Sequence, residues 1–529
     1  MRTPFASVML TLSKAEYIRL KWDADYWKMQ HQRALLREQE QKSKIETLEA
    51  QVRDLRQRFF GRKSERSGAR DESQAKPVLR GARGQRPNRP GHGRTPLEHL
   101  PMVEHIVDLA AADQRCPTCD WPLLLFPGTE DSVVLEVEVK AYRRRIRRQR
   151  YRPSCRCGTL PGIVTAPAPA RLIAKGKLGL SVWVEVLLDK FLYARPTNRL
   201  LQSWAGLGLK LSQGTITGGL KRIGPLFGPV MEALQARQLS DGVCHGDETG
   251  WRVFEPIEGK VGYGGYLWVV CSESALIYRM APSRSAATPL AHFAALRVQT
   301  ILICDRYAAY KKAARIIGLV LAFCWVHVRR DFLELARAYP PLEAWALAWV
   351  ERISTLYHLN HARLQVQADP LHFAEREAAL KAHLQQMAEE RDRALADRGL
   401  HRAARKAVES LDTHWPGLTV FVEHREVAMD NNTAERALRN EVLGRKSYYG
   451  SGSVWAAELA ATVFSLLMTL VHCWGINPRL GLQAYLQACA QNGQRPPPDL
   501  SPFLPWTMDP ARLRALREPT QASDWANTS

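Results

Sequence analysis

The chain contains DGVCHGDETGWRVF at residues 241–254 and TILICDRYAAY at residues 300–310. The first stretch has the pattern of a β-strand, with Asp247 inside it. The second is an apolar run typical of a buried strand, and it ends at Asp305 before a short helix. Because the carboxyl ends of strands border the ligand crevice of an open sheet, Asp305 is well placed to contribute to a site.

The segments around these two strands continue an α/β pattern. YLWVVCSESALIYRM (266–280) predicts two strands around a Ser-rich turn, and SAATPLAHFAALR (285–297) predicts a helix. LVLAFCWVHVRRDF (319–332) predicts a further strand that runs into a helix. The resulting order, strand-strand-strand-helix-strand-helix-strand, is that of a ribonuclease H-like fold.

A long helical segment interrupts this pattern. Residues 335–428 are rich in Ala, Leu, Glu, Arg and Gln and poor in strand formers, which predicts an all-helical insertion. The predicted fold class is therefore multidomain α/β, with a ribonuclease H-like catalytic core at 239–440 that contains the insertion. A C-terminal helical region is expected at 441–529.

Three acids lie where this fold brings acids together: Asp247 on the first strand, Asp305 after the fourth, and Glu435 on the helix that follows the insertion. Three converging carboxylates repel one another unless a cation is present, and hard oxygen ligands suit Mg²⁺ or Mn²⁺. Two such ions can activate a water or a 3′-hydroxyl for in-line phosphoryl displacement. This chemistry needs no nucleophilic Ser, Cys or Lys.

Each acid also has a purely structural interpretation. Asp247 could cap a turn, and Glu248 beside it competes for the same role. Asp305 could begin a helix as its N-cap, and Glu435 could pair with Arg439 four residues later. All three coincidences would be needed at once, in the right topological order, so we favour the catalytic interpretation.

Composition limits the partners. The 529 residues are 46% hydrophobic and carry a formal net charge of +21, which favours nucleic acid as the polyanionic partner. An anionic membrane surface is the rival, but the apolar run Val463–Leu470 falls far short of the ~20 residues of a spanning helix. We expect no signal peptide and no membrane association, and ten cysteines in so long a chain fit a reducing cytoplasm.

The first 110 residues predict a helix and a linker. Residues 1–60 form a helical segment whose apolar seam, Ile45, Leu48, Val52, Leu55 and Phe59, has coiled-coil spacing. An intramolecular helical hairpin is the alternative to self-association. Residues 61–98 are basic and nearly devoid of apolar side chains, which predicts a flexible linker, assigned to 61–110, that also contacts phosphates.

Residues 111–165 predict a zinc-ribbon-like DNA-binding module. Four thiolates could close a tetrahedral structural Zn²⁺ site, and the alternative is free core cysteines; the proposed ligands are Cys116, Cys119, Cys155 and Cys157. Between the two cysteine pairs, strand-like alternation surrounds a row of arginines expected to bind DNA: Arg143, Arg144, Arg145, Arg147 and Arg148.

Residues 166–238 predict a helix-turn-helix domain. TNRLLQSWAGLGLKLSQGTITGGLKRIG (197–224) gives a helix, a Gly-containing turn and a second helix from about Ser212. Most such helix pairs bind nothing, but this one follows a basic linker and the arginine row. The DNA contacts expected on it are Gln213, Thr215, Lys221 and Arg222.

The chain resembles the transposases of the insertion sequence 66 family, which are DDE transposases of bacterial mobile elements. The resemblance covers nearly the whole length, from RQRFFGRKSER through HGDETGWRV, CDRYAAY and CWVHVRRDF to DNNTAERALRN and LGRKSYYGS. The last block is the most specific. Two positions depart from the family pattern: the second cysteine pair is Cys-x-Cys instead of Cys-x-x-Cys, and Arg306 stands where Gly is expected.

The resemblance implies Asp247, Asp305 and Glu435 as the catalytic, metal-binding acids. It implies a bacterial cytoplasmic, nucleoid-associated enzyme that binds double-stranded DNA, both element ends and target, and that cuts and joins strands. A homodimer or larger assembly on DNA and accessory proteins of the same element are also expected. Alternatives are a structure-selective nuclease or resolvase and a non-catalytic repressor. The DNA contacts expected around the acids are His327, Arg329, Arg330, Asn431, Arg436, Arg439, Arg445 and Lys446.

Overall fold

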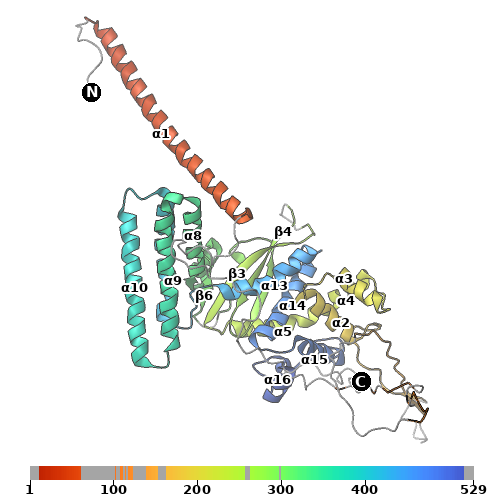
Figure 1. Cartoon of the computed structure of the whole chain (residues 1–529). Helices are drawn as coiled ribbons and strands as arrows, with labels where there is room; N and C mark the ends of the chain where they lie inside the picture. The colour runs from red at the N-terminus through yellow and green to blue at the C-terminus, as the bar shows by residue number, and fades with distance from the viewer. Residues whose placement is uncertain are drawn as a thin grey trace. The chain divides into compact units, whose positions relative to one another are not determined.

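The computed structural model describes residues 11–60, 102, 106, 108–110, 114, 117–122, 139–152, 163–256, 262–296 and 299–517. The chain divides into two compact units (Figure 1). The first unit comprises Met1–Arg86 and Trp325–Trp415, and the second comprises Pro87–Cys324 and Pro416–Ser529.

A five-stranded mixed sheet organises the second unit. Its order is β5-β4-β3-β6-β7, with β3 antiparallel to β4, β4 antiparallel to β5, and β3, β6 and β7 parallel. The predicted succession of strands and helices is therefore present. The strands are β3 (Val243–Arg252), β4 (Gly264–Cys271), β5 (Leu276–Ala281), β6 (Ile301–Cys304) and β7 (Val320–Phe323).

Helices cover both faces of this sheet. Along β3 the even-numbered side chains face α7, since Glu248 bonds to Tyr310, whereas Trp251 on the opposite face packs against α13 and α14. The helices of this unit are α2 (Leu180–Leu187), η2 (Leu188–Leu192), α3 (Thr197–Gly206), α4 (Gln213–Ile223), η3 (Gly224–Phe227), α5 (Gly228–Gln238), α6 (Ala287–Phe293), α7 (Ala308–Ile317), α12 (Val420–Glu423), α13 (Asn432–Tyr448), α14 (Val454–Met468), η5 (Thr469–Cys473), α15 (Pro478–Gln491), η6 (Ser501–Phe503) and α16 (Pro510–Arg517).

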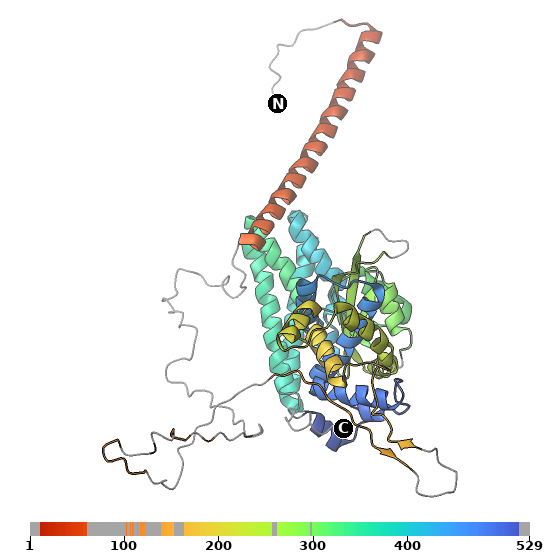
Figure 2. The same cartoon turned by 90° about the vertical axis from the view of Figure 1, so that its right-hand side faces the viewer.

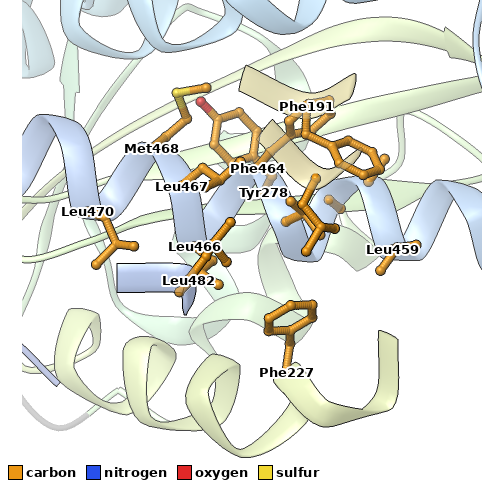
Figure 3. Packing of buried hydrophobic residues seen from close by; sticks show 14 of the residues in the cluster. Phe191, Phe227, Tyr278, Leu459, Phe464, Leu466, Leu467, Met468, Leu470 and Leu482 are labelled. Carbon is orange, nitrogen blue, oxygen red and sulfur yellow. The ribbon is translucent and has the colours of Figure 1, made fainter. Parts of the chain in front are cut away.

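Helix α14 is the centre of the core (Figure 3). The ring of Phe464 lies 5.6 Å from that of Phe191 and 5.8 Å from that of Tyr278, centroid to centroid. The hydroxyls of Ser465 and Thr469 accept hydrogen bonds from backbone N–H groups of the edge strand β5, at 2.8 and 3.0 Å. An edge strand with free N–H groups invites pairing with another chain. Helix α14 fills the core, and together with η5, which carries Thr469, it covers this edge.

One stretch of the described residues, Val454–Cys473, is long and apolar enough to cross a membrane, and 67% of its most apolar window is buried inside the protein. The packing of this stretch on the sheet accounts for its composition.

The first unit is helical. Its helix α9 packs between α8 and α10, and the rings of Phe332 on α8 and Trp349 on α9 stack 5.3 Å apart. Figure 2 shows the same helices after a quarter turn. The elements are α1 (Lys14–Phe60), α8 (Trp325–Ala338), η4 (Pro340–Leu342), α9 (Glu343–Gln365), α10 (Pro370–Ala396) and α11 (Arg402–Leu418), which ends just inside the second unit.

The long N-terminal helix follows the sequence prediction, and its last turns pack within the first unit. Arg53 Nε donates to the Ala338 carbonyl at 2.6 Å, and Ala50 is buried. The seam residues Ile45, Leu48 and Val52 are 57%, 51% and 47% exposed. Neither self-association nor a hairpin partner for this seam is tested by a single chain, so the coiled coil stays a prediction.

Two expected boundaries fall differently in the structure. The helical insertion forms a compact unit from Trp325 to Trp415, instead of about 335–428, because α8 begins directly after β7. The division at 440/441 would cut α13, which continues to Tyr448. Helices α2 to α5 and α14 also share one hydrophobic core with the sheet, so the helix-turn-helix segment and the C-terminal helices belong to the same unit as the strands.

Candidate active site

The register of β3 and β6 brings two of the three acids together. His245 on β3 pairs with Ile303 on β6 in a parallel ladder. Continuing this register by two residues sets Asp305 opposite Asp247, and neighbouring strands lie about 4.8 Å apart. Both side chains are half-buried. The carboxyl end of β6 therefore places one acid beside the other, as the sequence order predicted.

The third acid is positioned by Asn431. This residue is 1% exposed, and its Nδ2 donates to the Gly246 carbonyl at 2.8 Å while its Oδ1 faces His245 Nδ1 at 3.2 Å. Its backbone N–H bonds to Cys324 Sγ, just after β7, at 3.3 Å. The first turn of α13 is thus fixed on the backbone beside Asp247, and Glu435 lies one turn later, where its own N–H donates to the Asn431 carbonyl at 3.2 Å.

This geometry corrects the expectation that Asn431 contacts DNA. Both ends of its amide are engaged on β3, so it orients the helix instead of binding a phosphate. Because Nδ2 donates to Gly246, Oδ1 must accept, and the proton of His245 therefore sits on Nδ1. Burial lowers the pKa of His245, which keeps the imidazole neutral.

Electrostatics mark the acids as a cation site. The pKa of Asp247 is raised to about 7, first by burial and then by the negative charges of Glu248, Asp305 and Glu435, although the Glu248 N–H bonded to Oδ1 at 2.9 Å opposes the shift. A bound cation would favour the ionised form of Asp247. Asp247, Asp305 and Glu435 carry the oxygen ligands that Mg²⁺ and Mn²⁺ prefer, and their role as metal ligands stays a prediction.

The competing acid, Glu248, has different partners. Alternation along β3 turns it to the opposite face from Asp247, where its Oε2 accepts from the Tyr310 hydroxyl at 2.6 Å. Its Oε1 accepts from Arg284 Nε at 2.7 Å. Glu248 thus has a cation of its own, which favours Asp247 as the metal ligand.

Asp305 combines both roles considered for it. Its Oδ1 accepts from the Tyr307 N–H at 2.9 Å and shapes the turn before α7, which begins at Ala308. Its Oδ2 lies 4.0 Å from Arg284 Nη2, and 24% of the side chain is exposed. One oxygen therefore serves the turn while the other faces the site. Arg306, where the family has Gly, is half-buried beside it.

The basic residues of α13 separate into two groups. Arg436, Arg439 and Lys446 are exposed, and their contact with DNA stays a prediction. Arg445 instead donates from Nη1 to Thr249 Oγ1 at 3.0 Å and to the Gly250 carbonyl. It fastens the end of α13 to β3 through Nη1, and its expected phosphate contact stays a prediction.

The remaining predicted DNA contacts lie elsewhere. Gln213 and Thr215 are exposed in the first turn of α4, after the N-cap Ser212, and Lys221 and Arg222 are exposed in its last turn. The short pair of helices α3 and α4 thus presents these side chains to solvent. Three further residues were predicted to contact DNA near the acids. They lie on α8, in the first unit, and are His327, Arg329 and Arg330.

The arginine row lies in an exposed extended segment. Arg148 Nε donates to the Ala166 carbonyl at 2.6 Å, next to a two-residue ladder between β1 (Arg150–Tyr151) and β2 (Val164–Thr165). Arg143, Arg144, Arg145 and Arg147 are exposed before it. Of the four proposed zinc ligands, only Cys119 is described, with an exposed free thiol. Cys116, Cys155 and Cys157 lie outside the described residues.

Sequence reasoning missed Arg284, Tyr307 and Tyr310. Arg284 lies in the segment PSRSA (282–286), directly after β5, where neither periodicity nor a motif singles it out. Tyr310 could have been suspected, because an aromatic residue on the buried face of the helix after Asp305 must place its hydroxyl near a partner.

A family model described as Transposase IS66 family matches residues 175–459. This stretch includes the whole sheet and all three acids.

Two similar sequences come from Sinorhizobium fredii (strain NBRC 101917 / NGR234). Uncharacterized protein y4jD is 28% identical over 428 residues, covering 77% of this chain and 80% of the relative. Uncharacterized protein y4qI is 24% identical over 467 residues, covering 83% and 81%.

Among solved structures, the catalytic domain of the Mos1 mariner transposase is 12% identical, with a TM-score of 0.12. The match covers 21% of this chain and 62% of that domain, so it spans less than two thirds of the solved chain. A likeness at this score does not inform the fold.

Proposed function

The chain belongs to the IS66 transposase family, and on that premise we propose that it cuts the ends of its mobile element and joins them to target DNA at Asp247, Asp305 and Glu435. The observation that carries the proposal is the convergence of these acids, set by the β3–β6 register and by the attachment of Asn431 to β3. The strand order β5-β4-β3-β6-β7, in which β5, β4 and β3 are antiparallel neighbours and β3, β6 and β7 are parallel ones, supports a ribonuclease H-like core.

Bound at the three carboxylates, Mg²⁺ or Mn²⁺ would activate a water or 3′-hydroxyl and stabilise the leaving oxygen. The protein's own part is to hold the acids in place. Asn431 fixes the start of α13 and Arg445 its end, so Glu435 is carried by a helix fastened to β3 on both sides of Asp247. Phosphoryl transfer depends on ligands that are held in place in this way before the substrate binds.

Recognition of DNA is assigned to exposed cationic and polar side chains. Arg436, Arg439 and Lys446 on α13 would contact the backbone beside the acids, and the exposed residues of α4 would read the terminal inverted repeats. Because two ends must be joined, we expect a dimer or larger assembly on DNA, with α1 as the candidate contact.

The experiment is a cleavage and strand-transfer assay with purified full-length protein, Mg²⁺ and DNA carrying the element ends. Asp305→Asn should lower both products on the order of 10³-fold, because it removes a charge on which the cations depend. Asp499→Asn, an exposed acid in the same unit, is the matched control and should leave both unchanged. Full activity of Asp305→Asn would refute the catalytic assignment.

The same assay separates the alternative functions. A nuclease or resolvase gives cleaved ends without joined product. A repressor binds the end DNA and gives neither product. Chelation by EDTA should stop both steps in a transposase of this type.

A further inference from the structure

Arg284 is held in one orientation from several sides. Its Nε donates to Glu248 Oε1 at 2.7 Å, and its Nη2 contacts the same oxygen. The guanidinium carbon lies 3.9 Å from the ring centroid of Tyr307, whose hydroxyl donates to the Arg284 carbonyl at 2.7 Å. A long, flexible side chain is therefore ordered before any ligand arrives, which lowers the entropy cost of binding.

Glu248 is the buried end of this arrangement. Its side chain is fully buried, and its two oxygens accept from Arg284 and from Tyr310. Apolar residues of similar volume commonly stabilise a core as well as a buried ion pair does. The presence of the pair here is better explained by what its exposed end does than by stability.

The exposed end of Arg284 faces the candidate active site. Its side chain is 40% exposed, and Nη2 lies 4.0 Å from Asp305 Oδ2. Within the part of the chain that the structure describes, no residue accepts a hydrogen bond from Nη1. The guanidinium thus presents unused donors beside a metal-binding acid, in the planar fork that matches the oxygens of a phosphate.

We propose that Arg284 binds a phosphate of the DNA strand at the active site, and that Glu248, Tyr307 and Tyr310 are positioning residues that aim it. The inference rests on the proposed function and adds a substrate contact to it. Glu248 offsets much of the positive charge of Arg284, with which it forms a salt bridge. Arg284 therefore contributes directed hydrogen bonds more than net positive charge.

The test is a phosphate-by-phosphate coupling experiment on binding. End DNA is prepared with single neutral methylphosphonates at and around the cleavage site, and its affinity for the full-length protein is measured in EDTA and in Mg²⁺. For the wild type, one substitution should weaken binding about 10-fold, the size of a charge-assisted contact. For Arg284→Lys, which keeps a cation at Glu248 but lacks the fork, that same substitution should have little effect.

Two further variants keep the result interpretable. If Arg284→Gln alone fails to fold, the double variant Arg284→Gln with Glu248→Gln replaces it. The double variant removes both charges together, so that no buried carboxylate is left without its partner. Arg315→Gln, an exposed arginine in the last turn of α7, loses the same charge away from the acids and should respond to every methylphosphonate as the wild type does.

The outcomes are distinct. The proposal is supported if one methylphosphonate weakens binding of the wild type and of Arg315→Gln but no longer weakens binding of Arg284→Lys or of the double variant Arg284→Gln with Glu248→Gln. Equal sensitivity of all proteins at every phosphate overturns it. A wild type that shows the coupling but no Mg²⁺-dependent cleavage would refute the proposed function and leave the phosphate contact standing.

Discussion

Two buried glutamates of the same unit are in opposite states. Glu248 on β3 accepts hydrogen bonds from Tyr310 and Arg284. Glu441 on α13 is 0% exposed, and neither of its carboxyl oxygens has a hydrogen-bond partner among the described residues. The hydroxyl of Tyr278 nearby donates to the Ala437 carbonyl at 2.7 Å. Burial accordingly raises the pKa of Glu441 to about 8.

The comparison shows two ways in which this unit accommodates a buried glutamate. Burying a carboxylate is costly wherever it happens, and the cost is met either by a partner or by a proton. On the central strand β3, burial raises the pKa of Glu248, and the hydrogen bonds from Tyr310 and Arg284 oppose that shift. In the core, α13 carries Glu441 as a neutral acid only six residues after Glu435. The negative charge that cations would neutralise is therefore concentrated at the site.

The largest expected effect is a pH dependence of the free energy of unfolding, caused by Glu441. Between its ordinary pKa of 4.5 and about 8, the folded protein retains a proton that the unfolded chain has lost. The contribution of this proton to the free energy of unfolding is therefore complete below pH 4.5. It decreases by about 1.4 kcal/mol per pH unit as the pH rises towards the raised pKa. Glu441→Gln lacks this proton and should be more stable than the wild type at pH 8, by a few kcal/mol, with the advantage shrinking towards pH 5.

Urea unfolding at pH 5, 6.5 and 8 measures this difference. Glu458→Gln, at an exposed position on α14, is the control and should show no such trend. A constant difference between Glu441→Gln and the wild type across the three pH values would mean that Glu441 is ionised in the folded protein.

A smaller effect of opposite sign is expected for Glu248. Glu248→Ala leaves Arg284 and Tyr310 without their acceptor, and should lower the free energy of unfolding by roughly 2–3 kcal/mol. The exposed end of Arg284 can find water, which keeps the loss below that of a fully buried pair. Urea unfolding at pH 7 gives the value, and an unchanged midpoint would contradict the contrast between the two glutamates.

The sequence was sufficient to predict the succession of strands and helices along the chain. The metal site of the three acids stays a prediction. Alternation and apolar runs identify strands because one or both faces of a strand are buried. Once β3 and β6 are known to be parallel neighbours, Asp247 and Asp305 follow from register. The competing role of Glu248 needed the structure, because only the partner on each face of β3 separates two adjacent acids.

Residues whose role depends on a distant backbone group were not predictable in this way. Asn431 stands one turn before Glu435, a position from which it could orient that carboxylate or contact a phosphate, and its amide is buried against β3, at the Gly246 carbonyl 185 positions away in the chain. Arg445 stands in a basic row, yet it bonds to the end of β3. Arg284 comes from a turn without any pattern. Side-chain type and spacing carry no information on such contacts.

The smallest effect on stability, and the one most directly tied to the site, is expected for Asn431. Asn431→Ala leaves the Gly246 carbonyl and His245 Nδ1–H without partners, which should cost about 1–2 kcal/mol. Asn440→Ala, which removes a 3.2 Å bond from the same helix to the Phe191 carbonyl, is the matched control. Both variants should unfold slightly earlier than the wild type, but only Asn431→Ala should need more Mg²⁺ for half-maximal cleavage, because its Glu435 is no longer fixed relative to Asp247. If the two variants shift the Mg²⁺ requirement equally, Asn431 stabilises α13 without positioning Glu435, and the attachment of the helix to β3 is a matter of folding alone.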